Sequence, residues 1–138
     1  MASTKSFTSD SLAISVPDNA TSYEAVLSLA GAGSYAVTNA VTINGTALAN
    51  VEPKLVVSSS AASASFGSIS LNGGDTASRE AVVDADQNVT VSGNATFTGY
   101  AQVDVASGKT LASDALQAGH VSQETRILFS GVGSFVTN

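Results

Sequence analysis

Residues 88–105 read NVTVSGNATFTGYAQVDV, and this stretch decides the fold prediction. Every odd position from Val89 to Val105 is apolar or glycine, while the even positions are nearly all polar. A period of two is typical of a β-strand with one buried face. As a single strand, however, the stretch would extend about 56 Å, much longer than a usual strand. It must therefore contain bends that leave the same side chains facing inward.

A three-residue turn preserves this alternation, whereas a two-residue turn reverses it. Residues 92–94, Ser-Gly-Asn, fit such a turn because glycine and asparagine both tolerate positive φ. We therefore predict an antiparallel hairpin in which Val89 faces Phe97 across the pair. Gly99 then marks a bulge or bend within the second strand.

The same alternation crosses the glycine-rich residues 31–33, which favours a second hairpin. A helix competes with this interpretation, because Thr21 and Glu24 fit a capping box and Gly31 fits a helix C-cap. The sequence leaves open whether residues 22–30 form a strand or a short helix.

Other alternating or apolar runs, each bounded by turn residues, predict the remaining strands at 12–16, 41–43, 54–58, 69–71, 103–105, 125–129 and 133–138. We therefore predict an all-β fold of about eight to ten short strands, arranged as an antiparallel β-sandwich, a jelly roll or a small barrel.

A stacked solenoid is the rival architecture. Three segments, VTINGTA (41–47), ISLNGGD (69–75) and VTVSGNA (89–95), share a strand followed by a glycine. Their glycines at 45, 73 and 93 are spaced by 28 and then 20 residues. Regular coils need a constant period, so we interpret the similarity as recurring hairpin turns.

The length of 138 residues predicts one domain, residues 1–138. Within it, SSSAASAS at 58–65 predicts a flexible connector or a small-residue edge strand. Ser113 followed by ALQAG predicts one helical turn that Ser113 caps and Gly119 ends.

The composition argues against nucleic-acid, membrane and thiol functions. The chain has 5 Lys and Arg against 11 Asp and Glu, and only 12% of its residues are charged. Without a basic cluster, we expect no nucleic-acid binding. No apolar run is long enough to span a membrane, and the first ten residues lack the apolar region of a secretory signal. The absence of cysteine excludes disulfides and thiol chemistry.

Acidic residues at 84–88, Asp-Ala-Asp-Gln-Asn, resemble the start of a calcium loop. Val89 stands where an EF-hand needs glycine, and Ala95 stands where it needs a bidentate glutamate, so that motif is rejected. A looser cation site or a carboxylate pair at Asp84 and Asp86 is an alternative. We favour a simple acidic turn that leads into the strand at Val89.

Other candidate groups are isolated. His120 is the single histidine, and we interpret it as a loop residue. Gly108-Lys109-Thr110 matches the end of a Walker motif, but residue 103 is valine where the first glycine should be. The three tyrosines, Tyr23, Tyr35 and Tyr100, either stack on a sugar or lie at the core margin. We therefore predict no enzyme activity, no catalytic, cofactor-binding or metal-binding residues, and no cofactor.

In overall composition the chain resembles the small virion proteins that decorate phage capsids, the cement proteins and head fibres. It is acidic, rich in Ala, Ser, Thr, Val and Gly, and free of cysteine and tryptophan. Locally, residues 88–111 are similar to coils of autotransporter-type β-helices, although the irregular period and short length argue against a full β-helix. The first resemblance implies a homo-oligomer, in particular a trimer, that binds a major capsid protein.

From these features we predict a non-enzymatic capsid decoration protein at the virion surface that self-associates and stabilises the capsid. Weakly charged strands without protecting lysines suit such contacts. The alternative is an extracellular, cell-surface or pilus-type adhesin, or a carbohydrate-binding β-module. The identity of the partner, the oligomer number and the host are not encoded in these patterns.

Overall fold

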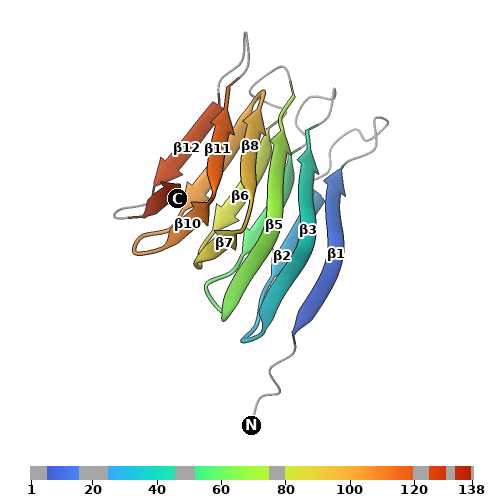
Figure 1. Ribbon diagram of the computed structural model, residues 1–138, viewed down its shortest axis with the longest axis vertical. Helices are drawn as coiled ribbons and strands as arrows, with labels where there is room; N and C mark the ends of the chain where they lie inside the picture. Colours follow the sequence, from blue (N-terminus) through green and yellow to red (C-terminus); the bar gives the residue numbers. More distant parts are fainter. Residues whose placement is uncertain are drawn as a thin grey trace.

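Two parallel β-sheets make up the protein (Figure 1). The computed structural model describes residues 6–15, 25–45, 52–74, 80–119, 125–129 and 133–137, with only the backbone described for 125–129. Within these ranges the chain forms thirteen strands and no helix. The predicted all-β class is therefore confirmed.

The larger sheet has eight strands, and the smaller sheet has five. The larger sheet contains β1 (Phe7–Ser15), β3 (Ser34–Asn44), β5 (Ser63–Asn72), β7 (Val89–Val91), β8 (Asn94–Thr98), β10 (Thr110–Ser113), β11 (Ala115–Ala118) and β13 (Ser134–Thr137). The smaller sheet contains β2 (Ala25–Leu29), β4 (Pro53–Val57), β6 (Ala81–Ala85), β9 (Ala101–Val105) and β12 (Thr125–Phe129).

Every strand pair described is parallel, so the predicted antiparallel sandwich, jelly roll or barrel is wrong. The chain alternates between the sheets and stacks each turn on the one before, which makes it a β-solenoid. In Figure 1, β1, β3, β5, β8 and β11 run up the view, while β6 and β12 run down it. One coil is thus a strand or strand pair of the larger sheet, a corner, and one strand of the smaller sheet.

The opening stretch forms most of one coil. Its three strands β7, β8 and β9 are separated by corners at residues 92–93 and 99–100. Val89, Val91, Ala95, Phe97, Ala101, Val103 and Val105 are all almost fully buried. The alternation continues through the corners because all strands of a coil surround the same core. Each corner changes the direction of the chain, but the same set of side chains still faces the core. Val89 therefore stacks on Ala64 and Leu111 of adjacent coils and does not face Phe97.

The second predicted hairpin is also a corner between sheets. Residues 25–29 form strand β2, so this part of the segment 22–30 is a strand and not a helix. Residues 22–24 lie outside the described residues. The glycine-rich residues 30–33 carry the chain from β2 in the smaller sheet to β3 in the larger one.

Two other sequence predictions are wrong because the segments concerned are parts of stacked coils. Residues 58–62 form a corner that leads into β5, and Ala61 and Ala64 are buried, so the segment is neither a flexible connector nor an edge strand. Residues 110–113 and 115–118 are strands β10 and β11, which replaces the predicted helical turn. Both segments stack on neighbouring coils whose backbone directs them.

The coils differ in length, which is why the spacing of similar segments misled the sequence analysis. Asn44 pairs with Asn72, 28 residues on, but Asn72 pairs with Thr98, 26 residues on. The true equivalents are therefore VTING, ISLNG and ATFTG, not VTVSGNA. A solenoid tolerates the variation because extra residues are accommodated at the corners while the strands stay in register.

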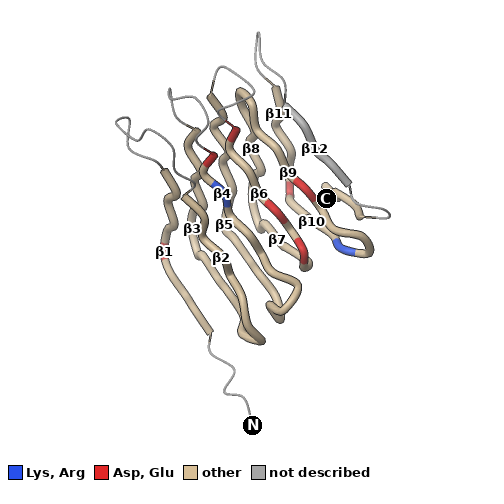
Figure 2. Tube along the Cα trace, turned by 180° about the vertical axis from the view of Figure 1, so that it is seen from behind, with Lys and Arg blue, Asp and Glu red and all other residues tan. Residues whose placement is uncertain are grey.

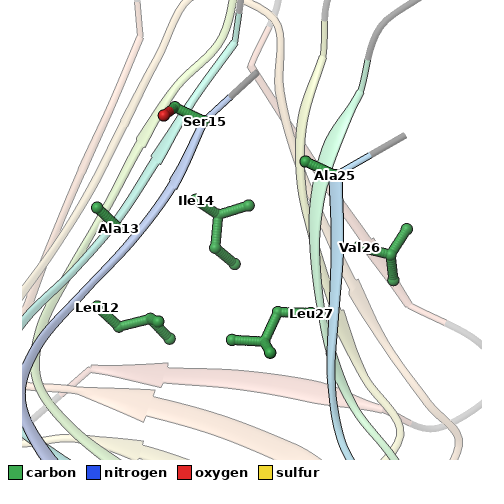
Figure 3. A pocket seen from close by; sticks show the side chains of 7 residues that line it. All are labelled: Leu12, Ala13, Ile14, Ser15, Ala25, Val26 and Leu27. Atoms are coloured by element: carbon green, nitrogen blue, oxygen red, sulfur yellow. The ribbon is translucent and has the colours of Figure 1, made fainter. Parts of the chain in front are cut away.

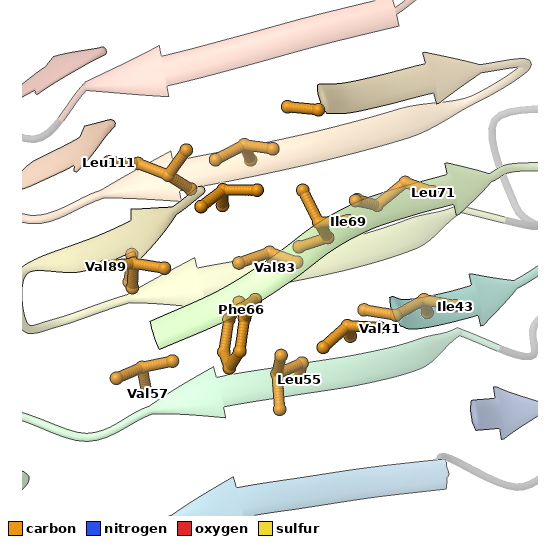
Figure 4. Close-up of a cluster of buried hydrophobic side chains, with 14 of the residues drawn as sticks. Val41, Ile43, Leu55, Val57, Phe66, Ile69, Leu71, Val83, Val89 and Leu111 are labelled. Carbon is orange, nitrogen blue, oxygen red and sulfur yellow. The ribbon is translucent and has the colours of Figure 1, made fainter. Parts of the chain in front are cut away.

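The core fills the space between the sheets (Figure 4). Its largest fully buried side chains come from both sheets: Phe66, Phe97, Ile43, Leu55, Ile69, Leu71 and Leu111, with Val41, Val57, Val83 and Val89. They lie in rows along the stack, such as the row of Leu27, Leu55, Val83 and Val103 in the smaller sheet. Each coil thus buries its apolar side chains against the coils beside it as well as against the opposite sheet.

A row of hydrogen-bonded polar side chains lies at the C-terminal ends of three strands in the larger sheet. The Asn72 Nδ2 donates to Asn44 Oδ1 at 2.8 Å, and Thr98 Oγ1 donates to Asn72 Oδ1 at 3.1 Å. The backbone continues the row, because the Gly73 amide donates to the Thr98 carbonyl at 2.8 Å. These bonds hold three coils in register where the strands end.

We expect Asn72→Ala to lower the free energy of unfolding by about 1–2 kcal/mol, because it removes two side-chain hydrogen bonds between coils. Denaturant unfolding measures the loss. The control is Asn39→Ala, whose side chain is exposed at the bend and should change the value by no more than about 0.5 kcal/mol. Equal losses would contradict a role for the row in stability.

Gly67, where β5 bends, gives a second prediction. A Cβ atom there would overlap the carbonyl oxygens of Thr38 and Asn39 in the adjacent coil. Gly67→Ala should therefore cost about 3 kcal/mol of stability. Gly108→Ala is the control: its φ is +71° but no atom lies within 4 Å of an added Cβ, so only about 1 kcal/mol of backbone strain is expected. Comparable losses in both variants would rule out close contact between the coils.

Candidate interaction surface

The outer surface of the larger sheet differs from the rest of the molecule because its strands carry so little charge. Among its eight strands only β1 contains a charged residue, Asp10. In the smaller sheet Lys54 lies on β4, Asp84 on β6 and Asp104 on β9, and Figure 2 shows blue and red segments along these strands. The two sheets therefore present chemically different surfaces.

Side chains that are mostly short and polar stack in rows on that surface, between the buried ones. We call it the hydroxyl face, and its rows are Thr8, Ala36, Ser65, Thr90, Ala112 and Val136; Ala13, Thr42, Ser70, Thr96 and Gln117; and Ser15, Asn44, Asn72 and Thr98. Neighbouring strands lie about 4.8 Å apart, so the rows form a regular array.

A shallow groove of about 150 Å³ crosses the hydroxyl face where the sheet bends. Thr38, Ser65, Thr90 and Ser92 supply hydroxyl groups along it, and Gly67 leaves its floor without a side chain. The groove offers hydrogen-bonding groups to a polar partner, and no charged residue lines it. Phe66, the aromatic residue of its lining, is buried in the core.

The acidic segment predicted from sequence is a corner of the solenoid. Asp84 lies on β6 and forms a salt bridge with Lys54 of β4, at 2.8 Å. Asp86 lies beyond the end of that strand, so the two carboxylates do not form the pair considered above. Asp84 instead lies in register with Asp104 of the neighbouring strand β9.

The residues after Asp86 join three coils. Gln87 donates through Nε2 to the Ala61 carbonyl at 3.0 Å and accepts at Oε1 from Lys109 Nζ at 3.0 Å. The Asn88 Oδ1 accepts from the Thr110 amide at 3.0 Å. These contacts support the interpretation as a structural turn, and they show Lys109 bound to a corner.

The remaining candidates do not gather at one place. Tyr35 is at the start of β3, half-buried against the core, with its hydroxyl donating to the Ala30 carbonyl. Tyr100 lies after the end of β8, at the opposite end of the strands, so the two do not form a stacking surface. Tyr23 and His120 lie outside the described residues.

Within the described ranges, no group of three or more His, Cys, Asp or Glu side chains is placed to hold a metal ion, and no helix is long and apolar enough to cross a membrane. No protein-family model, curated protein or solved structure matches this chain. The hydroxyl face, which sequence analysis missed, is visible in the sequence only once the coil register is known.

We expect Asp84→Asn to change the free energy of unfolding by at most about 1 kcal/mol, because its salt bridge is on the outer surface and partly exposed. Leu55→Ala, on the inner side of β4, should lose about 3 kcal/mol. The wild-type melting temperature should be the same in calcium as in a chelator. Calcium stabilisation that disappears in Asp84→Asn would instead establish a cation site.

Proposed function

We propose that this chain is a non-enzymatic structural protein whose hydroxyl face packs against a larger protein assembly, with the surface of a virion capsid as the first candidate. One observation carries the proposal: β3, β5, β7, β8, β10, β11 and β13 contain no charged residue. Covering these seven strands removes no strand charge from water, and the charges beside them are Asp10 on β1 and Asp114 at the bend between β10 and β11. Removing charge from water is the largest cost of burying a polar protein face.

The size of the outward side chains favours the same use. Ser, Thr, Ala and Asn have few rotamers to immobilise on contact, so a rigid array of them loses little entropy when it is covered. A face of this kind suits many repeated contacts on a symmetric particle. In this proposal the partner is a major capsid protein, and the chain self-associates on that surface, for which the compositional resemblance implies a trimer.

A cell-surface adhesin is the second candidate, and one observation favours it. Residues 88–111, which are similar to coils of autotransporter-type β-helices, form strands β7 to β9 and lead into β10 of a parallel solenoid. A carbohydrate-binding role within this candidate would use the hydroxyl groups of the groove at the bend.

Pelleting with purified particles from the native source tests the proposal. We expect the wild-type chain to co-sediment with the particles. Thr42→Lys, at the centre of the hydroxyl face, should weaken this binding at least about tenfold because it buries an unpaired charge. Gln102→Lys, which adds the same charge to the outer side of β9 in the other sheet, is the control and should bind normally.

Three results would count against the virion assignment. Wild type and Thr42→Lys could pellet equally, or neither could pellet, and in both cases the hydroxyl face has no role on the particle. Binding to cell envelopes from the same source but not to particles would support the adhesin.

A further inference from the structure

Both ends of the solenoid present open strand edges. Among the described residues, no strand pairs with the outer edge of β1 or β2 at the N-terminal end, or of β11, β12 or β13 at the C-terminal end. Solenoid proteins require terminal repeats with a polar outer face to remain single in solution. The ends of this molecule lack that protection in its described part.

Mostly apolar side chains line a slot at the N-terminal end. Leu12, Ile14 and Leu27 point into the space between β1 and β2, where they line a slot of about 360 Å³ (Figure 3). These side chains begin the rows that run through the core, for example from Leu27 to Leu55. Phe7, on the same β1 edge, is 43% exposed.

The C-terminal end continues those same rows. Phe135 of β13 contacts Phe97 edge to face, with ring centroids 6.2 Å apart. It also ends the row that starts at Phe7 and passes through Tyr35, Ala64, Val89 and Leu111. An aromatic residue thus occupies the first and last position of one ladder.

The open edge of β1 can pair with the open edge of β13 of another copy. All strands of the larger sheet are parallel, so the outer edge of β1 and the outer edge of β13 carry the two halves of one parallel hydrogen-bond ladder. Charge does not oppose the contact between the two ends. Their strands β2, β11 and β13 contain no charged residue, β1 contains only Asp10, at its bulge, and β12 contains only Arg126, of the opposite sign.

We infer that the N-terminal end of the solenoid binds the C-terminal end of a second copy of this chain. In the continued register Phe7 pairs with Phe135 of the next copy, and Thr8 pairs with Val136. Such a contact is heterologous and does not close on itself, so it produces linear stacks. This inference rests on the self-association in the proposed function and names its surface, but it replaces the trimer that the compositional resemblance implies with an open linear stack.

Sedimentation of the purified full chain over a range of concentrations tests the contact. We expect wild type to form dimers and longer linear species with no preferred size. Thr8 and Val136 are both exposed, so charges can be placed there without disturbing the core. The double variant Thr8→Glu/Val136→Glu sets like charges opposite each other, and Thr8→Glu/Val136→Lys sets opposite charges.

We expect the like-charged variant to associate about tenfold more weakly than the oppositely charged one. Gln102→Glu, on the outer side of β9 in the smaller sheet and away from both ends, is the matched control and should associate like wild type. Melting temperatures of all variants check that each one is folded.

A wild-type chain that stays monomeric, or a closed trimer unaffected by either double variant, would overturn the inference. A monomer that still pellets with particles would overturn end-to-end contact alone and leave the proposed function standing. If association and particle binding both fail, the proposed function fails with it.

Discussion

The structure depends on one constraint: a single coil of this chain cannot bury its own apolar side chains. Each coil supplies one strand or strand pair to the larger sheet and one strand to the smaller sheet, and residues such as Leu55, Ile69 and Phe97 become buried only between neighbouring coils. Stacking also pairs every strand with a parallel partner, which satisfies the backbone groups. The polar row at Asn44 and Asn72 then fixes the register where strands end.

The chemistry of the surface follows from the same arrangement. In-register stacking repeats the outward residues of one coil above those of the next, so the polar positions of the alternating pattern become rows. In the larger sheet these rows are uncharged, which gives the hydroxyl face its proposed role in packing against an assembly. In the smaller sheet Lys54 and Asp84 neutralise each other across adjacent coils.

The sequence predicted the strands better than their partners. Alternation from Val89 to Val105 identified the inner face correctly, because a hairpin and a solenoid corner both preserve it. It could not distinguish Phe97 from Ala64 as the neighbour of Val89, since that depends on contacts about 25 residues away. Coils of unequal length hid the repeat, and the hydroxyl face was hidden with it. The segment from Asp84 to Asn88 was correctly predicted to turn and lead into the strand at Val89.

Backbone NMR contacts between strands test the parallel stacking most directly. We predict inter-strand contacts of Val89 with Ala64 and Leu111, and of Phe97 with Leu71 and Ala118, as expected for parallel pairs. Contacts between the α-protons of Val89 and Phe97, or of Val91 and Ala95, are the mark of an antiparallel hairpin. Their observation in place of the predicted contacts would contradict the solenoid and every conclusion about its faces and ends.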